Sequence, residues 1–277
     1  MNVMNFFRDY KFKEKDALGQ YHYWLDFMEK FTDIKQMCLD DYLLNKYDPK
    51  DIAVEKVFTY SKIAFEKMKE VSKTIEKICV ELANKKIEMI DVSLLEINII
   101  IYHGLGNAAG WATKYKGMPT IMLGVEKIVE LAWDDQESLR NLIYHEYAHL
   151  LHEYVRETDL EPYDDHYRKW INRIYIEGFA TYLESILSGT RRRNDWFKAC
   201  KEKESQLKEE LLHRLNHQLS CQDFFGDWYQ VFGLSDTGYY LGHQYIKTLM
   251  DLYDIEYIAK MPFIQIEAAL FKYLKSD

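Results

Sequence analysis

The segment LIYHEYAHLLHEY, residues 142–154, decides how the rest of the chain is interpreted. It contains HEYAH, in which His145 and His149 are four residues apart and Glu146 follows the first histidine. In a helix each residue turns by about 100°, so residues four apart lie within about 40° of each other. The two imidazoles therefore face the same side and can bind one Zn²⁺. Glu146, one step around the helix, can reach a water molecule on that metal.

A catalytic zinc site also needs a third protein ligand and an open fourth position. The metzincin pattern is excluded, because it requires Gly and His where this chain has His152 and Val155. The other arrangement places a glutamate on a following helix, and Glu177 in YIEGFATYLESIL, residues 175–187, fits it. Apolar residues recur around Glu177 at helical spacing, and a carboxylate in such surroundings is costly to bury unless it is paired or metal-bound. The 27 residues between His149 and Glu177 leave room for a loop and a returning helix.

HEYAH followed by IEGFATYLE resembles the gluzincin metallopeptidases, whose signature is HExxH plus a downstream Glu. The local match is similar to the M1-type aminopeptidases. The spacing and the late segment TGYYLGHQYI, residues 237–246, are similar to the thimet-type oligopeptidases. Size and motif order resemble a family of small bacterial Zn-dependent proteases, over about residues 94–250. M1-type aminopeptidases carry GxMEN before the motif helix, whereas GNAAGW, residues 106–111, has no acidic residue, which leaves endo- or oligopeptidase activity open.

The resemblance implies a role for each matching residue. His145, His149 and Glu177 would hold Zn²⁺, and Glu146 would be the general base that takes a proton from water and returns it to the leaving amine. The expected function is zinc-dependent hydrolysis of peptide bonds. Two rival functions remain open: a catalytically inactive zincin-like binding protein, and a zinc hydrolase of a non-peptide amide.

Further roles follow from the same resemblance. Tyr239 would donate a hydrogen bond to the oxyanion, with Tyr240 as the alternative. Thr181, one turn after Glu177, would orient that ligand. The strand at residues 119–125 would be the sheet edge that aligns an extended peptide by main-chain hydrogen bonds.

The predicted fold class is α+β, mostly α: a zincin-like small sheet with the active-site helix, flanked by N- and C-terminal helices. Residues 1–92 are expected to form an N-terminal helical region, and residues 93–277 one compact zincin-like catalytic region. Asp48 and Pro49 mark the start of a long amphipathic helix. Strands are predicted at 94–102 and 119–128. Later helices are predicted at 136–154, 166–188, 194–216, 222–232, 238–253 and 263–275.

Composition limits the partners. A net charge of −9 argues against nucleic-acid binding, which needs clustered Lys and Arg. No apolar run approaches the roughly 20 residues of a membrane span, and no secretion signal is evident. The four cysteines form no CxxC pair and are expected to be reduced, buried thiols, so we expect a soluble, cytoplasmic protein that acts on a peptide or protein. The oligomeric state is left open.

Several polar residues have alternative explanations. Asp164, Asp165 and His166 lie between the ligand segments and are possible substitutes for Glu177. A solvated loop is the simpler explanation for Arg191–Arg193, although these residues are candidates to bind a substrate carboxylate. Surface, turn or packing roles are the simpler explanations for three histidines: His103, His152 and His243.

Overall fold

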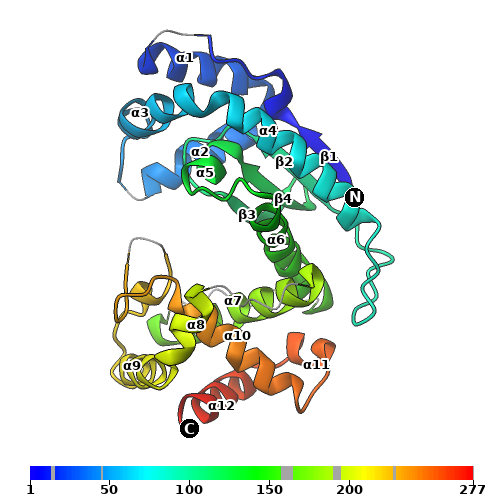
Figure 1. Cartoon of the computed structure of the whole chain (residues 1–277), viewed down its shortest axis with the longest axis vertical. Helices are drawn as coiled ribbons and strands as arrows, with labels where there is room; N and C mark the ends of the chain where they lie inside the picture. Colours follow the sequence, from blue (N-terminus) through cyan, green and yellow to red (C-terminus); the bar gives the residue numbers. More distant parts are fainter. Residues whose placement is uncertain (14–15, 45, 157–164, 190–194, 227–228, 277) are drawn as a thin grey trace. The chain divides into compact units, whose positions relative to one another are not determined.

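The computed structural model describes residues 1–13, 16–44, 46–156, 165–189, 195–226 and 229–276. This part of the chain is mostly helical and contains a small four-stranded sheet, which confirms the predicted α+β, mostly α class. Contacts divide the chain into two compact units, whose elements are labelled in Figure 1. The sheet unit comprises Met1–Lys85 and Glu96–Glu146, and the helical unit comprises Lys86–Leu95 and Tyr147–Asp277.

This division does not follow the predicted boundary near residue 93. The reason is a strand at the N-terminus, β1 (Asn2–Asn5), which pairs in parallel with β2 (Asn98–Tyr102). The first 85 residues thus share a sheet with residues 96–146. A four-residue strand of sequence NVMN carries too little pattern to be predicted from the sequence.

The sheet has the order β1-β2-β4-β3 and mixes parallel and antiparallel pairs. β4 (Met118–Gly124) is parallel to β2 and antiparallel to β3 (Gly110–Tyr115). The prediction that residues 119–125 form the sheet edge is therefore wrong, because β4 is an inner strand and β3 is the edge. Lys116 and Gly117, both with positive φ (51° and 79°), make the two-residue hairpin that returns the chain.

A long helical segment in the sheet unit begins where the sequence predicts. The Asp48 side chain accepts from the Lys50 N–H, and Pro49 occupies the first turn. α3 (Pro49–Ile52) continues through a π-helical turn into α4 (Phe58–Ala83). Asn5 of β1 donates from its side chain to Ser72 Oγ on α4 (2.9 Å), and Figure 1 shows α4 running alongside the strands.

The loop between β2 and β3 is fixed by buried polar contacts. The Glu126 carboxylate on α5 (Val125–Glu130) accepts from the Gly104 and Gly106 N–H groups, at 2.9 and 3.0 Å. Trp24 Nε1 on α1 (Ala17–Met28) donates to the His103 carbonyl. His103 directly follows β2, and its ring is buried in the core. Between α1 and α3 lies a further helix of this unit, α2 (Thr32–Leu44).

Most predicted C-terminal helices are present. α6 (Gln136–Arg156) and α7 (His166–Ser188) match closely, whereas the helix predicted over 194–216 is interrupted at Lys203. The helix predicted at 222–232 is not found in the described part of that range, 222–226 and 229–232. A 3-10 turn forms at Gln222–Phe224, and Gly226, with φ 110°, departs from helical geometry. The remaining helices are α8 (Asp195–Glu202), α9 (Glu204–Asn216), α10 (Thr237–Met250), α11 (Ile255–Ala259) and α12 (Phe263–Leu274).

Two glycines let α7 and α10 touch through their backbones within the helical unit. A Cβ on Gly178 of α7 would lie 2.5 Å from the carbonyl carbon and oxygen of Gly242 on α10. A Cβ on Gly242 would lie 2.6 Å from the Ile174 carbonyl oxygen. Contacts this short are incompatible with any side chain. Figure 1 shows α10 beside α7.

All four cysteines are free and buried, as expected for reduced thiols. Within the described residues, no helix combines the length and the apolar character that crossing a bilayer requires.

Candidate metal centre

The two motif histidines lie in the middle of α6. Asp135 starts this helix, because its carboxylate accepts from the N–H groups of Glu137 (2.9 Å) and Ser138 (3.0 Å). The helix extends from Gln136 to Arg156, so His145 and His149 lie in regular helix, more than one turn from either end. Their relative position is set by α6 itself, although the division between the two units falls between Glu146 and Tyr147.

Glu177 lies at the midpoint of α7. The Asp165 carboxylate caps the helix by accepting from the Tyr167 N–H (2.9 Å), and Gly189 ends it in the left-handed conformation (φ 67°). Asp165 precedes the helix and Gly189 follows it, and each is a common residue type at its capping position. The returning helix that the ligand spacing requires is therefore present.

The structure brings the three predicted metal ligands together. His145, His149 and Glu177 each offer a ligand atom, and these atoms all lie within 4.8 Å of one another. His149 Nε2 and Glu177 Oε2, both in the helical unit, are 3.4 Å apart, and their side chains are 16% and 18% exposed. Two ligands at about 2.1 Å from a tetrahedral ion lie about 3.4 Å apart. The spacing of His149 and Glu177 thus matches two ligands of one zinc ion, and His145 is close enough to be the third candidate ligand.

Glu146 is held against the edge strand of the sheet unit. It is buried (7% exposed), and its Oε1 would lie 3.1 Å from a Cβ built on Gly110, the first residue of β3. Glycine at this position leaves room for the carboxylate. The candidate general base therefore lies beside the backbone of the outer strand, a relation that the sequence did not reveal.

The two candidate tyrosines differ in their surroundings. The Tyr240 hydroxyl is in the core, where it donates to Glu204 Oε2 (2.6 Å), and the Tyr240 side chain is fully buried. Because the Tyr240 hydroxyl is already bonded to Glu204 in the core of the helical unit, its surroundings favour Tyr239 over Tyr240 as the oxyanion donor. Tyr239 is half-buried in the first turn of α10 and lies edge-on to Phe225, with ring centroids 5.6 Å apart.

The position of Tyr239 follows from the contact between α7 and α10. Glu177 adjoins Gly178, and Tyr239 precedes Gly242 by about one turn. Both candidate residues therefore lie close to the point where the two backbones meet. Tyr239 therefore remains the candidate donor.

The predicted role of Thr181 is wrong. Its hydroxyl is buried (1% exposed) and finds no hydrogen-bond partner in the described part of the chain, so it does not orient Glu177. Asp165 caps α7, and His166 Nε2 accepts from Trp170 Nε1 (3.1 Å), so neither replaces Glu177 as a ligand. Asp164 and Arg191–Arg193 lie outside the described residues.

Two further histidines serve packing. His243 is 9% exposed and lies edge-on to Phe197. His152 stacks on Phe179, with ring centroids 4.2 Å apart, and its Nε2 lies 3.3 Å from the Tyr175 hydroxyl. Burial, aided by Arg156, lowers the pKa of His152 to about 3.

We expect His152 to make the metal-free protein less stable in acid. The folded state holds this ring neutral, whereas the unfolded chain protonates it near pH 6.5. The free energy of unfolding should therefore fall by about 1.4 kcal/mol for each pH unit below 6.5, until about pH 3. Denaturant unfolding between pH 7.5 and 4.5 should show a flatter dependence in His152→Gln. A His22→Gln control, at an exposed position, should follow the wild type, and an unchanged slope in His152→Gln would contradict the assignment.

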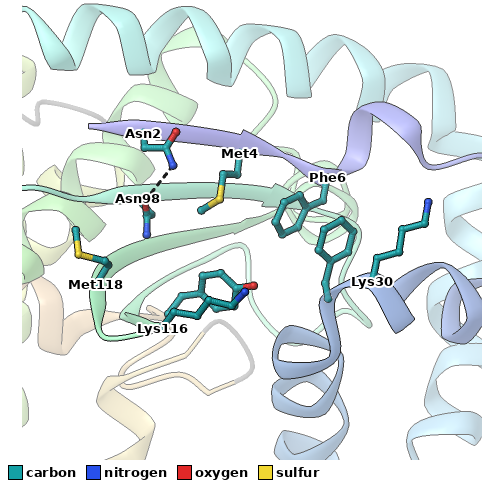
Figure 2. Close-up of a pocket in the computed structure, with 9 residues that line it drawn as sticks. Asn2, Met4, Phe6, Lys30, Asn98, Lys116 and Met118 are labelled. Atoms are coloured by element: carbon teal, nitrogen blue, oxygen red, sulfur yellow. Dashed lines mark hydrogen bonds between the residues drawn. The ribbon is translucent and has the colours of Figure 1, made fainter.

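A shallow groove also lies on the sheet unit, with a volume of about 360 Å³. Figure 2 shows Phe6 at one side of it and the hydrogen bond between Asn2 and Asn98 at the other. The Phe6 ring stacks on that of Phe31, with ring centroids 3.7 Å apart. Its lining includes lysines but no acid or imidazole, so it provides neither metal ligand nor base. The residues that line it are Asn2, Met4, Phe6, Lys30, Phe31, Asn98, Tyr115, Lys116 and Met118.

Comparisons with protein-family models, with curated proteins and with solved structures find no match for this chain. The residues and their geometry are therefore the basis for a functional assignment.

Proposed function

We propose that this chain is a zinc-dependent metallopeptidase of the gluzincin type. The observation that supports this most strongly is the convergence of His145, His149 and Glu177 within 4.8 Å, with Glu146 in the intervening sequence. If the HExxH motif had arisen by chance, there would be no reason for a glutamate from a separate helix to lie at ligand distance from its histidines. A zincin-like arrangement of the sheet unit is supported by an antiparallel edge strand, β3, against which Glu146 lies.

The zinc ligands, Glu146 and β3 have different roles in the proposed hydrolysis. When bound by the two imidazoles and Glu177, zinc supplies the Lewis acidity that makes water nucleophilic near neutral pH. Glu146 accepts the proton of the attacking water at its carboxylate and delivers it to the nitrogen of the leaving amine. Its neighbour β3 offers an outer edge on which an extended peptide can form main-chain hydrogen bonds, with its scissile bond near Glu146.

The test combines metal analysis with cleavage of a mixed peptide library. We expect about one zinc per chain after loading, cleavage by the loaded protein, and none by protein stripped with a chelator until zinc is restored. Zinc-loaded protein that cleaves no peptide would favour the inactive binding protein. Cleavage of simple amides without cleavage of peptides would favour the non-peptide hydrolase.

Replacing Tyr239 by Phe should lower kcat by about 10²-fold while KM and zinc content stay unchanged, because one oxyanion donor is lost. The adjacent Tyr240→Phe is a matched control that removes the bond to Glu204 in the core. It should reduce stability by about 1 kcal/mol without a comparable effect on kcat. Equal loss of kcat in both variants would indicate a shared structural effect.

A further inference from the structure

Arg173 is a half-buried cation on α7 that rests on aromatic rings. Its guanidinium carbon lies 4.6 Å from the ring centroid of Phe225 and 6.0 Å from that of Trp170. In the described part of the chain, no carboxylate lies within salt-bridge distance of Arg173. By contrast, Arg168 on the same helix faces Asp165 at 3.9 Å. The rings of Phe225 and Trp170 therefore support this cation, and the described part of the chain pairs no carboxylate with it.

Arg173 lies on the same helix as Glu177, one of the proposed metal ligands. Arg173 precedes Glu177 by four residues, so both side chains leave α7 on the same side, with Cα atoms about 6 Å apart along the axis. The Phe225 ring that supports Arg173 also contacts Tyr239 edge-on, at 5.6 Å. A common ring thus supports both the cation and the candidate oxyanion donor, and all these residues belong to the helical unit.

The chemistry of guanidinium indicates what it binds. An arginine stays charged at any relevant pH, and stacking on rings occupies its faces while the N–H groups in its plane remain available. Those N–H groups form a fork that matches the two oxygens of a carboxylate. We propose that Arg173 binds the free α-carboxylate at the C-terminus of the substrate, an inference that rests on the proposed peptidase function.

This assigns the substrate class as peptides with a free C-terminus, from which a short fragment is released. One extended residue spans about 3.5 Å, and Arg173 stands one helical turn from a metal ligand. The carboxylate bound by Arg173 is therefore one to three residues beyond the scissile bond. The protein would be an exopeptidase acting from the C-terminal end, in agreement with the absence of an acidic residue in GNAAGW that would bind a substrate amine.

The test uses one peptide library prepared twice, with free C-terminal carboxylates and with C-terminal amides. We expect the zinc-loaded wild type to cleave the free peptides at least about 10-fold faster in kcat/KM, near their C-termini. Arg173→Gln should lower kcat/KM for the free peptides by about 10-fold or more, leave the amides unchanged, and retain its zinc. Arg168→Gln, on the same helix, is the matched control and should keep the wild-type preference.

The outcomes separate this inference from the function on which it rests. Equal cleavage of both libraries by the wild type, or an unaltered preference in Arg173→Gln, would refute the role of Arg173 and leave a peptidase. A wild type that binds zinc and cleaves neither library would refute both. Loss of activity on amides as well as free peptides in Arg173→Gln would show that Arg173 has a structural role instead. Circular dichroism and zinc content confirm that each variant is folded.

Discussion

Glu146→Gln is expected to lower kcat for peptide hydrolysis by about 10³–10⁴-fold, the upper part of the range for a positioned general base. The amide keeps the shape of the side chain but cannot accept the proton of water. Because Glu146 is not one of the three residues that converge as ligands, the zinc content should stay near one per chain. The measurement is steady-state cleavage of a fluorogenic peptide together with metal analysis of the same samples.

The structure provides a matched control on the same helix. Glu153 is exposed on α6, and Glu153→Gln makes the same chemical change away from the ligands. Its kcat should stay close to that of the wild type. Hydrolysis by Glu146→Gln at more than about a tenth of the wild-type rate would mean that another group acts as the base.

Glu177→Ala is expected to weaken zinc binding by about 10²–10³-fold, because each ligand of a zinc site contributes on the order of 3 kcal/mol. His149 Nε2 would lose the carboxylate oxygen that lies 3.4 Å away, and only the two imidazoles would remain. Activity should disappear in zinc-buffered solution near the wild-type Kd and return in part at high zinc. Competition with a chromophoric chelator measures the affinity directly.

A loss of affinity in Glu177→Ala has to be separated from unfolding of α7. The Glu153→Ala variant tests whether removal of any helix carboxylate lowers affinity, and it should not. Circular dichroism of Glu177→Ala should match that of the wild type. Unchanged zinc affinity in a folded Glu177→Ala protein would remove the central support for the proposed function.

Much of the candidate site is predictable because its signals are local. The spacing of His145 and His149 determines their common face, and the apolar pattern around Glu177 indicates a helix of suitable length. Helix caps such as Asp48 are also local, and the structure places that cap where the sequence predicts. These patterns depend on residues a few positions apart, so one sequence is sufficient to read them.

The parts that the sequence did not predict depend on distant partners. β1 is a strand only because β2 lies beside it, and β3 is the edge only because of the hairpin at Lys116 and Gly117. Arg173 has an ordinary helical position in the sequence. Its significance comes from Phe225, which is 52 residues away and lies 4.6 Å from the guanidinium. The choice between Tyr239 and Tyr240 likewise required the position of Glu204.

The backbone contact between Gly178 and Gly242 has a consequence for the evolution of this protein. Neither position tolerates even a methyl group while its partner stays in place, since added atoms would lie within 2.7 Å of main-chain atoms. Saturation libraries selected for folded protein should thus return glycine at both sites, while exposed Ile186 on the same helix varies freely. Among natural variants, the pair would be inherited together as a signature of this helix crossing, independent of whether the metal ligands persist.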